Sequence, residues 1–449
     1  MNTVVRECIN FKMNDNGMVD VLEGDKVIGE VELGVHALLT LFNGYMSDDN
    51  IIEILSELTQ LDKDKAKKMF DKITENYKYI LEKKDSVFRN FDVFINSKQK
   101  VNLNRLRAIV PKFLVLSLTR DCFMQCRYCY AGARYCENID EAKGLEIELI
   151  DKILKDAKKL GIRHIEITGG DPFIRKDIYE ILQKTVEEEI HINISTKKLL
   201  SIQEIKQLKQ TGLKSIQISI DTLDDYIAKY LTGIDDFAER MIEVISKLIS
   251  NGIDVTVNTV VTKKNIKGIP VLITKLNNMG VKEHMISPYL RTLGRHDELL
   301  FPDEEDYKLL EEFIYNYEGK MNVNYKSPKY EIKSKTLMNI PRCSGGRMGL
   351  VIIPNGKVTI CERLIDSEEC IIGDVKKQSL IDIWNSDELY NLIYPKRSKF
   401  INTDCYDCDD YEKCILDKGL CYARSKIAYG TIYNKDPLCP RETKFMRFV

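Results

Sequence analysis

The chain has 449 residues, of which 44% are hydrophobic and 30% are charged, and its formal net charge is −2 at pH 7. This composition is ordinary for a globular protein, and the length leaves room for two or three domains. The near-neutral charge offers no broad surface for nucleic acid, and no apolar run is long enough to span a bilayer. Residues 1–16 lack the apolar segment of a signal peptide, so we expect a cytoplasmic protein that binds neither nucleic acid nor a membrane.

Thirteen cysteines are the unusual feature of this composition. Cys8 lies near the start, four lie between Cys122 and Cys136, and eight lie between Cys343 and Cys439. An odd number of cysteines in a long chain without an export signal argues against a disulfide framework. Ligation of metals or iron–sulfur clusters explains most of them better, whereas Cys8 and Cys136 fit no ligand pattern and are expected to be ordinary thiols.

Residues 1–95 are predicted to form a small α/β domain. Two short apolar runs, residues 18–22 and 27–31, are separated by a polar turn and indicate a hairpin. A hairpin followed by three helices is the outline of a winged helix-turn-helix domain. The three helices are expected over residues 33–42, after Asp48 or Asp49, and after Asp62.

Residues 96–112 are rich in Lys and Arg and are predicted to be a basic linker. From residue 113 to about residue 300, six apolar runs of strand length alternate with segments of helical periodicity. Such repeats imply a parallel sheet with helices outside it, either as an open sheet or as a partial barrel. In both cases functional residues belong at the carboxyl ends of the strands. The predicted strands are residues 113–119, 164–168, 190–195, 215–220, 254–261 and 282–288.

The first predicted strand leads into a loop with Cys122, Cys126 and Cys129 in a C-x3-C-x2-C arrangement. Three thiolates on one short loop can hold three irons of a [4Fe–4S] cube, which normally has four cysteine ligands. The fourth iron would stay open, and an open position is typical of catalytic rather than structural metal centres. On spacing alone, the alternative is a zinc knuckle or a set of buried structural cysteines.

Polar residues at the ends of the other predicted strands are candidate ligand contacts. The second strand ends in Thr168-Gly169-Gly170-Asp171-Pro172, where glycines allow a close approach of the backbone to a ligand. An arginine beyond the sixth strand could pair with a carboxylate. Each of these residues could instead simply cap its strand. The remaining candidates are Ser195, Thr196, Ser219, Asp221, Asn258, Arg291 and Arg295.

The cysteine loop and the Gly169-Gly170-Asp171 turn one β–α unit later resemble the radical S-adenosylmethionine (SAM) enzymes. This resemblance implies a (βα)6 partial barrel and a [4Fe–4S] cluster on the three loop cysteines, whose open iron chelates SAM. Asp171 stands where the family usually has the longer Glu. The SAM contacts that the resemblance implies are Gly169, Gly170, Asp171, Ser195, Ser219, Asp221, Asn258 and Arg291.

Residues 301–342 are predicted to be a bridging helical region, and residues 343–449 resemble a SPASM domain, which houses two auxiliary [4Fe–4S] clusters. The resemblance assigns Cys405, Cys408, Cys414 and Cys439 to one cluster, and Cys343, Cys361 and Cys421 to the other. Six residues separate Cys414 from Cys421, where the family usually has three. Either Cys370 completes the second set, or its iron is open to a substrate thiolate. A pair of zinc sites is the alternative.

Residues 31–44 resemble the PqqD-like recognition element, which binds leader sequences of precursor peptides along its third strand and third helix. The alternatives are a DNA-binding winged helix and a structural cap. Together with the core and the tail, the arrangement resembles radical SAM/SPASM maturases of ribosomally made peptides, especially the sactisynthases and ranthipeptide synthases that install thioether cross-links.

The resemblance therefore predicts a radical SAM oxidoreductase with three [4Fe–4S] clusters, SAM, a precursor peptide as substrate and a flavodoxin or ferredoxin as electron donor. A 5′-deoxyadenosyl radical would abstract hydrogen from the peptide before an oxidative thioether cross-link forms. The alternatives are carbon–carbon cross-linking, peptide excision or sulfatase maturation. An alternative of a different class is a non-catalytic zinc protein with a nucleic-acid-binding winged helix. The sequence identifies no side chain as a general base.

Overall fold

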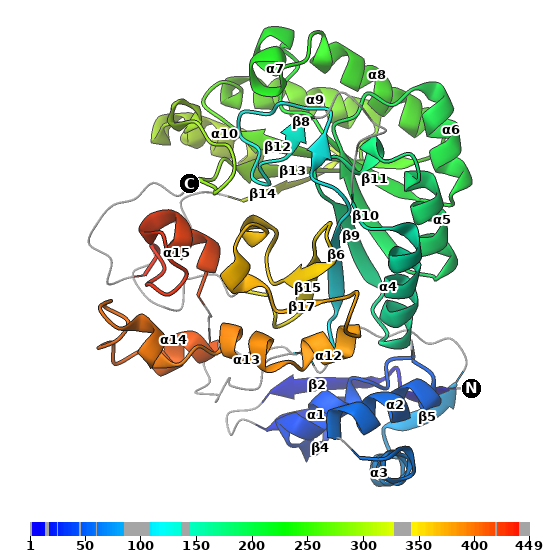
Figure 1. Ribbon diagram of the computed structural model, residues 1–449. Helices are drawn as coiled ribbons and strands as arrows, with labels where there is room; N and C mark the ends of the chain where they lie inside the picture. Colours follow the sequence, from blue (N-terminus) through cyan, green and yellow to red (C-terminus); the bar gives the residue numbers. More distant parts are fainter. Residues whose placement is uncertain are drawn as a thin grey trace.

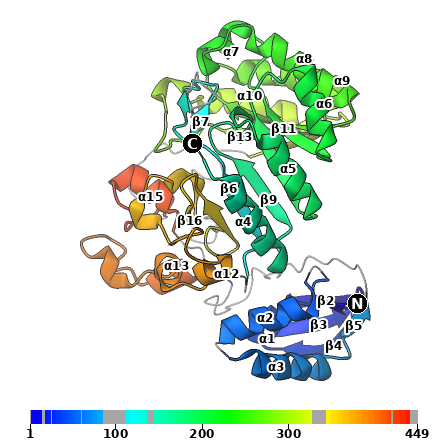
Figure 2. The ribbon, with the colours of Figure 1, turned by 45° about the vertical axis from the view of Figure 1, so that its right-hand side comes forward.

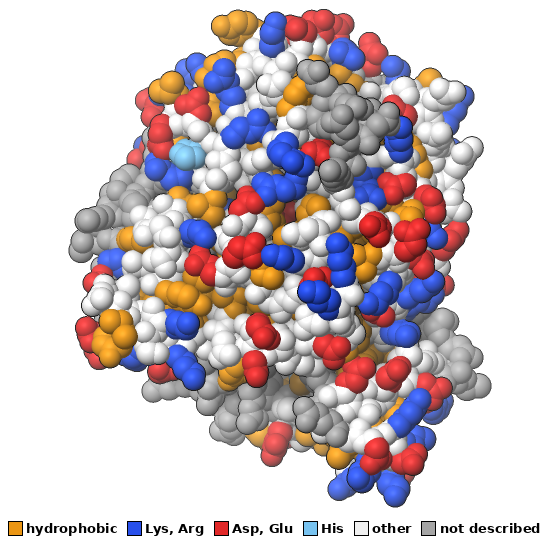
Figure 3. Space-filling view, in the orientation of Figure 1, with side chains coloured by type: hydrophobic (Ala, Val, Ile, Leu, Met, Phe, Trp, Pro, Cys, Tyr) orange, Lys and Arg blue, Asp and Glu red, His pale blue; other side chains and the backbone are white. Residues whose placement is uncertain are grey.

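The computed structural model describes residues 2–13, 18–24, 26–44, 46–59, 61–84, 108, 110–135, 144–326, 343–417 and 420–439. Most of the predicted linker, part of the predicted bridging region and Cys136 lie outside these ranges. Within them, none of the helices is both long and apolar enough to cross a membrane. Figure 1 shows a small amino-terminal domain below a large sheet, with the carboxy-terminal helices beside that sheet. Figure 3 shows acidic and basic side chains interspersed over one face of the molecule.

The amino-terminal domain contains a three-stranded antiparallel sheet followed by three helices. The predicted hairpin and helices are present, and Asp62 caps the third helix by accepting a hydrogen bond from the Lys65 N–H at 2.9 Å. A strand that precedes the hairpin completes the sheet. The elements are β2 (Ile9–Met13), β3 (Val19–Glu23), β4 (Lys26–Val31), α1 (Leu33–Leu39), α2 (Asp48–Thr59) and α3 (Lys63–Asn76).

The sequence pattern misses two further strands of this domain, β1 (Asn2–Val5) and β5 (Leu81–Lys84), which pair with each other antiparallel. Each is only four residues long, and its partner lies at the other end of the domain, so no local pattern marks it. Asp48 at the start of α2 anchors β1, because its carboxylate accepts hydrogen bonds from the Thr3 N–H at 2.7 Å and the Thr3 hydroxyl at 3.0 Å. The pair therefore closes the domain.

A ten-stranded sheet forms the centre of the protein, in the order β14-β13-β12-β11-β10-β9-β6-β15-β16-β17. Every neighbouring pair from β14 to β15 is parallel. The six predicted strand–helix units supply β6 and β9 to β13, in sequential order across the sheet. Their bounds are β6 (Phe113–Ser117), β9 (His164–Thr168), β10 (His191–Thr196), β11 (Ser215–Ser219), β12 (Asp254–Val261) and β13 (Glu283–Pro288).

The sheet is larger than predicted. The region 301–342, which was expected to be helical, contains α10 (Glu304–Tyr315) but also β14 (Asn322–Tyr325), which pairs with β13. The cysteine-rich tail adds three strands at the opposite edge, where β15 pairs with β6. These strands are short and form because the edges of the central sheet are available for pairing. The added strands are β15 (Gly349–Ile352), β16 (Lys357–Thr359) and β17 (Gly373–Asp374).

Helices cover one face of the central sheet (Figure 2). The helical periodicity of the sequence puts apolar residues on the buried faces, for example Ile150 and Leu154 in α4 and Met241 and Leu248 in α8. They pack on the Ile and Val side chains of the strands. The covering helices are α4 (Ile147–Lys159), α5 (Ile178–Glu187), α6 (Ile202–Gln210), α7 (Asp225–Thr232), α8 (Phe237–Ser250) and α9 (Ile269–Met279).

The amino-terminal domain packs against the central sheet at the end where its strands begin. The side chain of Met46 lies over Gly161, where an added Cβ would be 2.6 Å from the Met46 Cε. Gly161 also has a φ of +70°, which other residues rarely adopt. A side chain at this position would therefore both strain the end of α4 and push the two domains apart.

His36 of α1 provides a pH-dependent term in the stability of this domain. Its side chain is 1% exposed and lies edge-on to Phe11, with 4.7 Å between the ring centroids. Burial, helped by the positive charge of Lys112, lowers the pKa of His36 to about 4. Because His36 in the unfolded chain has the ordinary pKa of about 6.5, the unfolded chain binds the proton first as the pH falls.

We therefore expect the stability contributed by neutral His36 to be complete above about pH 6.5 and to be lost as the pH falls towards about 4. Between pH 7 and 5 the loss should be about 2 kcal/mol, measured as hydrogen exchange of α1–α3 amides in the full-length protein. The variant His36→Leu should lose less over the same interval. A His36→Leu variant with the same pH dependence as the parent would contradict this account, and His296→Gln is the control.

Candidate active site at the carboxyl ends of the strands

The three cysteines of the C-x3-C-x2-C motif lie on a loop directly after β6. The loop begins with the short strand β7 (Asp121–Cys122), which pairs with β8 (Arg134–Tyr135). The middle of the cysteine loop is hydrogen-bonded to the end of α7. The backbone N–H groups of Gln125 and Arg127 donate to backbone carbonyls of α7 at 3.1 and 3.0 Å. The structure thus fixes this loop at the carboxyl end of the sheet, as the sequence predicts.

The sulfurs of the loop share one buried space. Cys122 and Cys126 are buried, and Cys129 is half-buried. Burial raises the pKa of Cys122 to about 12 and that of Cys126 to about 11, with smaller contributions from the neighbouring thiols of the trio. The Met124 and Ala133 N–H groups each approach a cysteine sulfur at 3.4 Å. Iron would bind such thiols as thiolates, and N–H···S contacts tune a cluster's potential, so this donor set fits an iron–sulfur cluster.

The glycines of the Gly169-Gly170-Asp171 turn pack against the start of the cysteine loop. The Gly170 N–H donates to the Thr119 carbonyl at 2.7 Å. A Cβ on Gly169 would lie 2.4 Å from the Thr119 oxygen, and one on Gly170 would lie 2.0 Å from the Asp121 oxygen. The glycines are therefore needed for a backbone-to-backbone contact within the protein, a role that the sequence analysis did not assign to them.

The carboxylate of Asp171 is used by the protein itself. It accepts hydrogen bonds from the Phe173 and Lys197 N–H groups, both at 3.0 Å, and from the Thr196 hydroxyl at 2.8 and 2.9 Å. Burial raises its pKa. These contacts give Asp171 the task of fastening the turn after β9 to the end of β10, and they occupy both oxygens of the predicted SAM contact.

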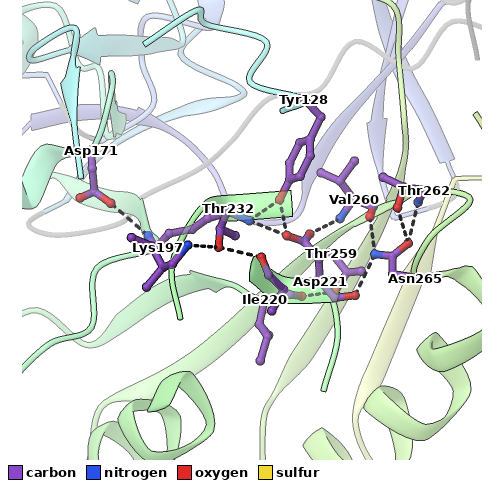
Figure 4. Close-up of polar contacts among 12 residues, drawn as sticks. Tyr128, Asp171, Lys197, Ile220, Asp221, Thr232, Thr259, Val260, Thr262 and Asn265 are labelled. Carbon is purple, nitrogen blue, oxygen red and sulfur yellow. Dashed lines mark hydrogen bonds and ion pairs between the residues drawn. The ribbon is translucent and has the colours of Figure 1, made fainter. Parts of the chain in front are cut away.

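Asp221, at the end of β11, is the centre of a buried network with Lys197 and Tyr128 (Figure 4). The Lys197 Nζ lies 2.5 Å from both the Asp221 Oδ2 and the Tyr128 hydroxyl oxygen, and the Tyr128 hydroxyl donates to Asp221. The Val260 N–H donates to the Asp221 Oδ1 at 2.9 Å. Asp221 was predicted to contact SAM, but here it ties the cysteine loop to three strand ends.

Burial and ion pairing together determine the protonation states of Lys197 and Tyr128 in this network. Burial favours a lower pKa for Lys197, but the carboxylate of Asp221 and the nearby Cys126 thiol outweigh it and raise the pKa. Burial raises the pKa of Tyr128 strongly, so the phenol keeps its proton. Sequence reasoning missed both residues. The only indication for Tyr128 was its place between the second and third cysteines, and for Lys197 its place after the third strand.

Ser195, Ser219 and Asn258 are half-buried and lie on the face of the sheet opposite the helices. Ser219 and Asn258 are neighbours in register, and the Asn258 amide oxygen accepts a hydrogen bond from the Ser287 hydroxyl at 3.0 Å. The structure thus brings these predicted residues close to one another. Their side chains are more accessible than those of Asp171 and Asp221.

The two arginines after β13 have different positions. The Arg291 guanidinium pairs with Glu298 at 2.5 Å. Arg295 instead contacts the cysteine loop. Its backbone N–H donates to the Cys129 carbonyl at 2.9 Å, and its guanidinium donates to the Ala133 carbonyl at 2.7 Å. Of the two, the structure places Arg295 rather than Arg291 against the loop.

Glu362 is a candidate functional residue that the sequence did not indicate. It follows Cys361 directly, and the Tyr130 hydroxyl donates to its carboxyl oxygen at 3.3 Å. Burial, followed by repulsion from Glu166, raises its pKa to about 7. Because Tyr130 belongs to the first cysteine loop and Cys361 to the tail, this carboxyl lies between the two cysteine-bearing parts of the protein.

The tail cysteines influence one another's pKa values in two sets. Neighbouring thiols contribute to the raised pKa of Cys405 and of Cys361, although burial is the main cause in both. Buried Cys370 lies near Cys361. Among the described residues, no three His, Cys, Asp or Glu side chains are close enough to share a single metal ion. One group comprises Cys405, Cys408, Cys414 and Cys439, and the other comprises Cys343, Cys361 and Cys421.

Two helices accommodate the six-residue interval between Cys414 and Cys421. Cys414 lies on α14 (Tyr411–Asp417), and Cys421 immediately precedes α15 (Tyr422–Tyr429). The Arg424 guanidinium on α15 forms an ion pair with Asp436 at 2.7 Å, and the Cys439 N–H donates to the Asp436 carbonyl at 2.8 Å. These contacts hold the last cysteine against α15 despite the longer interval.

Comparison with known proteins identifies two domains in the chain. The family described as the radical SAM superfamily matches residues 116–274, and an iron–sulfur cluster-binding domain, SPASM, matches residues 343–409. The chain is 27% identical over 346 residues to the PqqA peptide cyclase of Granulibacter bethesdensis, covering 73% of this chain and 87% of that protein. It is 25% identical over 337 residues to the PqqA peptide cyclase of Gluconobacter oxydans, covering 73% and 90%.

Solved structures share the fold. Streptococcus suis SuiB bound to precursor peptide SuiA has a TM-score of 0.64 at 19% identity and covers 97% of this chain and 99% of that one. Native anSMEcpe with bound AdoMet has a TM-score of 0.51 at 15% identity and covers 73% and 94%. The non-catalytic zinc protein is therefore not retained as an alternative. The protein is an enzyme with a radical SAM domain and an iron–sulfur cluster-binding SPASM domain.

Proposed function

We propose that the protein is an oxidative maturase that forms a thioether cross-link within a ribosomally made precursor peptide. The observation that carries this proposal is the group of Cys343, Cys361 and Cys421, three neighbouring thiols with Cys370 beside one of them. Three thiolates leave one iron of an auxiliary cluster open, and a cysteine of the peptide could bind there. The product would have lost one S–H and one C–H hydrogen for each C–S bond formed.

The comparisons support a peptide as substrate. The curated relatives are PqqA peptide cyclases, and SuiB, whose fold is shared over 97% of this chain, has been solved with its precursor peptide. We assign the parallel sheet and its helices to a (βα)6 partial barrel. The amino-terminal domain would act as a PqqD-like recognition element, because β4 is an edge strand of its sheet and α3 follows in the expected order.

A [4Fe–4S] cluster held by Cys122, Cys126 and Cys129, together with SAM, would supply a 5′-deoxyadenosyl radical that removes a hydrogen atom from the peptide. The two tail groups would hold auxiliary clusters, three clusters in all, and these would accept the electron that the peptide loses when the thioether forms. A flavodoxin or ferredoxin would be the external electron donor. In this proposal the accessible strand-end residues Ser195, Ser219 and Asn258 orient SAM, with the Gly169-Gly170 turn beside them.

The chain's own charged groups have separate tasks in this proposal. The Lys197–Asp221 pair holds Tyr128 and thereby the cysteine loop in place. Glu362, held by Tyr130, is positioned to accept the proton that the peptide loses during its oxidation. A carboxyl group in such a position can act as a general base when it reaches the substrate directly.

A carbon–carbon cross-link is the second candidate. It is favoured by the names of the curated relatives, since a peptide cyclase closes a bond within its own substrate. One experiment distinguishes the thioether from the carbon–carbon cross-link. Reconstituted enzyme, SAM and a reductant are incubated with cysteine-bearing peptides that are encoded by short neighbouring reading frames. Mass spectrometry should show a loss of two hydrogens per bond and protection of the cysteine thiol from alkylation. A product that keeps a free thiol would exclude the thioether.

Replacing the three loop cysteines by alanine should abolish the release of 5′-deoxyadenosine, because no ligands for the SAM-binding cluster would remain. Cys8, which is exposed in the amino-terminal domain, provides the control variant Cys8→Ala. Chromatographic detection of 5′-deoxyadenosine measures the outcome. Turnover by the triple variant at the rate of the parent would refute the assignment.

Lys197→Met should slow 5′-deoxyadenosine formation at least about tenfold, because a buried carboxylate left without its cation typically costs about 3–5 kcal/mol. The matched control is Lys198→Met, whose ammonium pairs with the half-buried Glu204 at 2.5 Å. The iron content and thermal midpoint of both variants report the state of the loop. Equal activity of the two variants would show that the Lys197–Asp221 pair does not position the cluster loop.

Val27 tests the recognition element, because it is a 52% exposed hydrophobic side chain on β4. The variant Val27→Glu should weaken peptide binding about tenfold or more while SAM cleavage without peptide persists. Leu309→Glu, at a 61% exposed position on α10, is the matched control. Fluorescence anisotropy of a labelled peptide measures the affinity, and equal binding by Val27→Glu and the parent would count against docking on β4.

A further inference from the structure

The two groups of tail cysteines lie in surroundings of opposite charge. The first, called the Cys343 group here, has an arginine two to four residues after each of its cysteines. The second, called the Cys405 group, is flanked mainly by aspartates. Nearby charge helps to set the potential of a redox centre, so this difference bears on electron transfer. The Cys343 group consists of Cys343, Cys361 and Cys421, and the Cys405 group consists of Cys405, Cys408, Cys414 and Cys439.

Both groups fit an iron–sulfur cluster better than a single metal ion. Within each group the thiols contribute to one another's raised pKa, although burial is the main cause. Among the residues that the structure describes, no three His, Cys, Asp or Glu side chains are close enough to hold one ion. Thiols that are neighbours at this wider spacing suit a cube, in which each thiolate binds a different iron.

Arg363 places a positive charge beside Cys361. Its guanidinium donates to the Arg291 carbonyl at 2.7 Å, its buried Nε has no hydrogen-bond partner, and it forms no ion pair within the described part of the chain. Burial raises the pKa of Cys361 to about 12, and both the backbone N–H and the charge of Arg363 oppose this rise. Glu362, which lies between the two in sequence, accepts its hydrogen bond from Tyr130 in the cysteine loop. The charge of Arg363 is therefore available to the Cys343 group.

Arg347 and Arg424 add positive charge near Cys343. Arg347 is 2% exposed, and its guanidinium donates to the Ile415 carbonyl at 2.6 Å. Burial is the main reason that the pKa of Cys343 is raised, and the charges of Arg347 and Arg424 both oppose that rise. Three guanidinium groups thus lie near the Cys343 group.

The ion pair between Arg424 and Asp436 lies between the two groups. The guanidinium donates to both carboxylate oxygens, at 2.9 and 2.7 Å. Arg424 acts on Cys343, whereas Asp436 adds to the burial that raises the pKa of Cys414. The cation of this pair is therefore on the side of the Cys343 group, and its carboxylate is on the side of the Cys405 group.

The carboxylates near the Cys405 group have the opposite effect. Burial raises the pKa of Cys405 and of Cys414 to about 12. Asp404 contributes further to the rise for Cys405, and Asp410 does so for Cys414. The negative charge at this end of the tail thus acts directly on the thiols.

Two cations lie near the Cys405 group, but each is paired with a carboxylate. Lys435 pairs with Asp404 at 2.5 Å, and Arg397 pairs with Glu412 at 3.7 Å. Asp407 and Asp409, on either side of Cys408, are exposed and form no ion pair with any described residue. The surroundings of the Cys405 group therefore remain negative.

An iron–sulfur cluster gains one negative charge when it accepts an electron, so its potential depends on the charges around it. Nearby cations stabilise the reduced form and raise the potential, whereas carboxylates lower it. Thioether formation from a carbon radical and a thiol releases one electron and one proton. The electron is therefore held best where the surroundings are more positive.

We propose that Arg347, Arg363 and Arg424 give the Cys343 group the higher potential of the two auxiliary sites and so hold there the electron that the peptide loses. The C–S bond forms between the carbon radical and the thiol sulfur, the thiol proton passes to Glu362, and the one electron left over reduces the Cys343 site. The aspartates of the Cys405 group oppose its passage to the second site. This inference rests on the auxiliary clusters of the proposed function and assigns the order of their potentials.

Redox titration of the auxiliary clusters, followed by electron paramagnetic resonance, tests this order. The full-length chain is reconstituted with Cys122, Cys126 and Cys129 replaced by alanine, so that only auxiliary clusters contribute to the signal. Cys361→Ala and Cys414→Ala, added one at a time, assign each midpoint potential to its group. Iron content and thermal midpoint show that each variant is folded and loaded.

Arg363→Met should lower the higher midpoint by a tenfold or larger change in the reduction equilibrium, which is about 59 mV for one electron. Arg363→Lys keeps the charge and should stay close to the parent. Asp404→Asn should move the lower midpoint the other way, because it removes a carboxylate and leaves Lys435 unpaired. Arg240→Met, at an exposed position on α8, is the control and should change neither midpoint.

Two results would overturn the order but leave the proposed function standing. One is a higher midpoint that belongs to the Cys405 group, and the other is a pair of midpoints that Arg363→Met leaves unchanged. A folded protein that takes up no auxiliary cluster would instead count against the proposed function itself.

Discussion

The buried carboxylate of Asp221 is the contact on which the geometry of the site depends. It receives Lys197 from the end of β10, Tyr128 from the cysteine loop and the Val260 N–H from β12. A charge buried in a protein must be paired and hydrogen-bonded, and here each of its partners comes from a different segment. The cysteine loop has little regular structure of its own, so its position follows from this network, from the glycine turn and from the end of α7.

The parts of the site that the sequence predicts are those with local patterns. The spacing of the loop cysteines, the strand that precedes them and the apolar faces of α4 and α8 can all be recognised within short windows. Lys197 and Glu362 could not be recognised in this way, because each acquires its partners only after folding. Lys197 meets a carboxylate that lies 24 residues further along the chain, and Tyr130 meets Glu362 across 232 residues.

The same limit explains the corrections to the fold. β14 and β15 are four residues long and form only because β13 and β6 offer free edges. The glycines after β9 have a clear pattern, but the pattern did not reveal what approaches them, which is the backbone of Thr119 and Asp121. The type of a residue thus predicts which conformations and contacts are possible at its position. Which segment makes the contact is decided only when distant segments pack together.

The pairing of β15 with β6 has a consequence for the synthesis of the protein. Gly349 lies opposite Phe113, so the strand that carries the cysteine loop keeps one open edge until the carboxy-terminal third of the chain has left the ribosome. An unpaired parallel edge beside free thiols is prone to aggregation and oxidation. The growing chain is therefore most vulnerable in the interval before β15 joins the sheet.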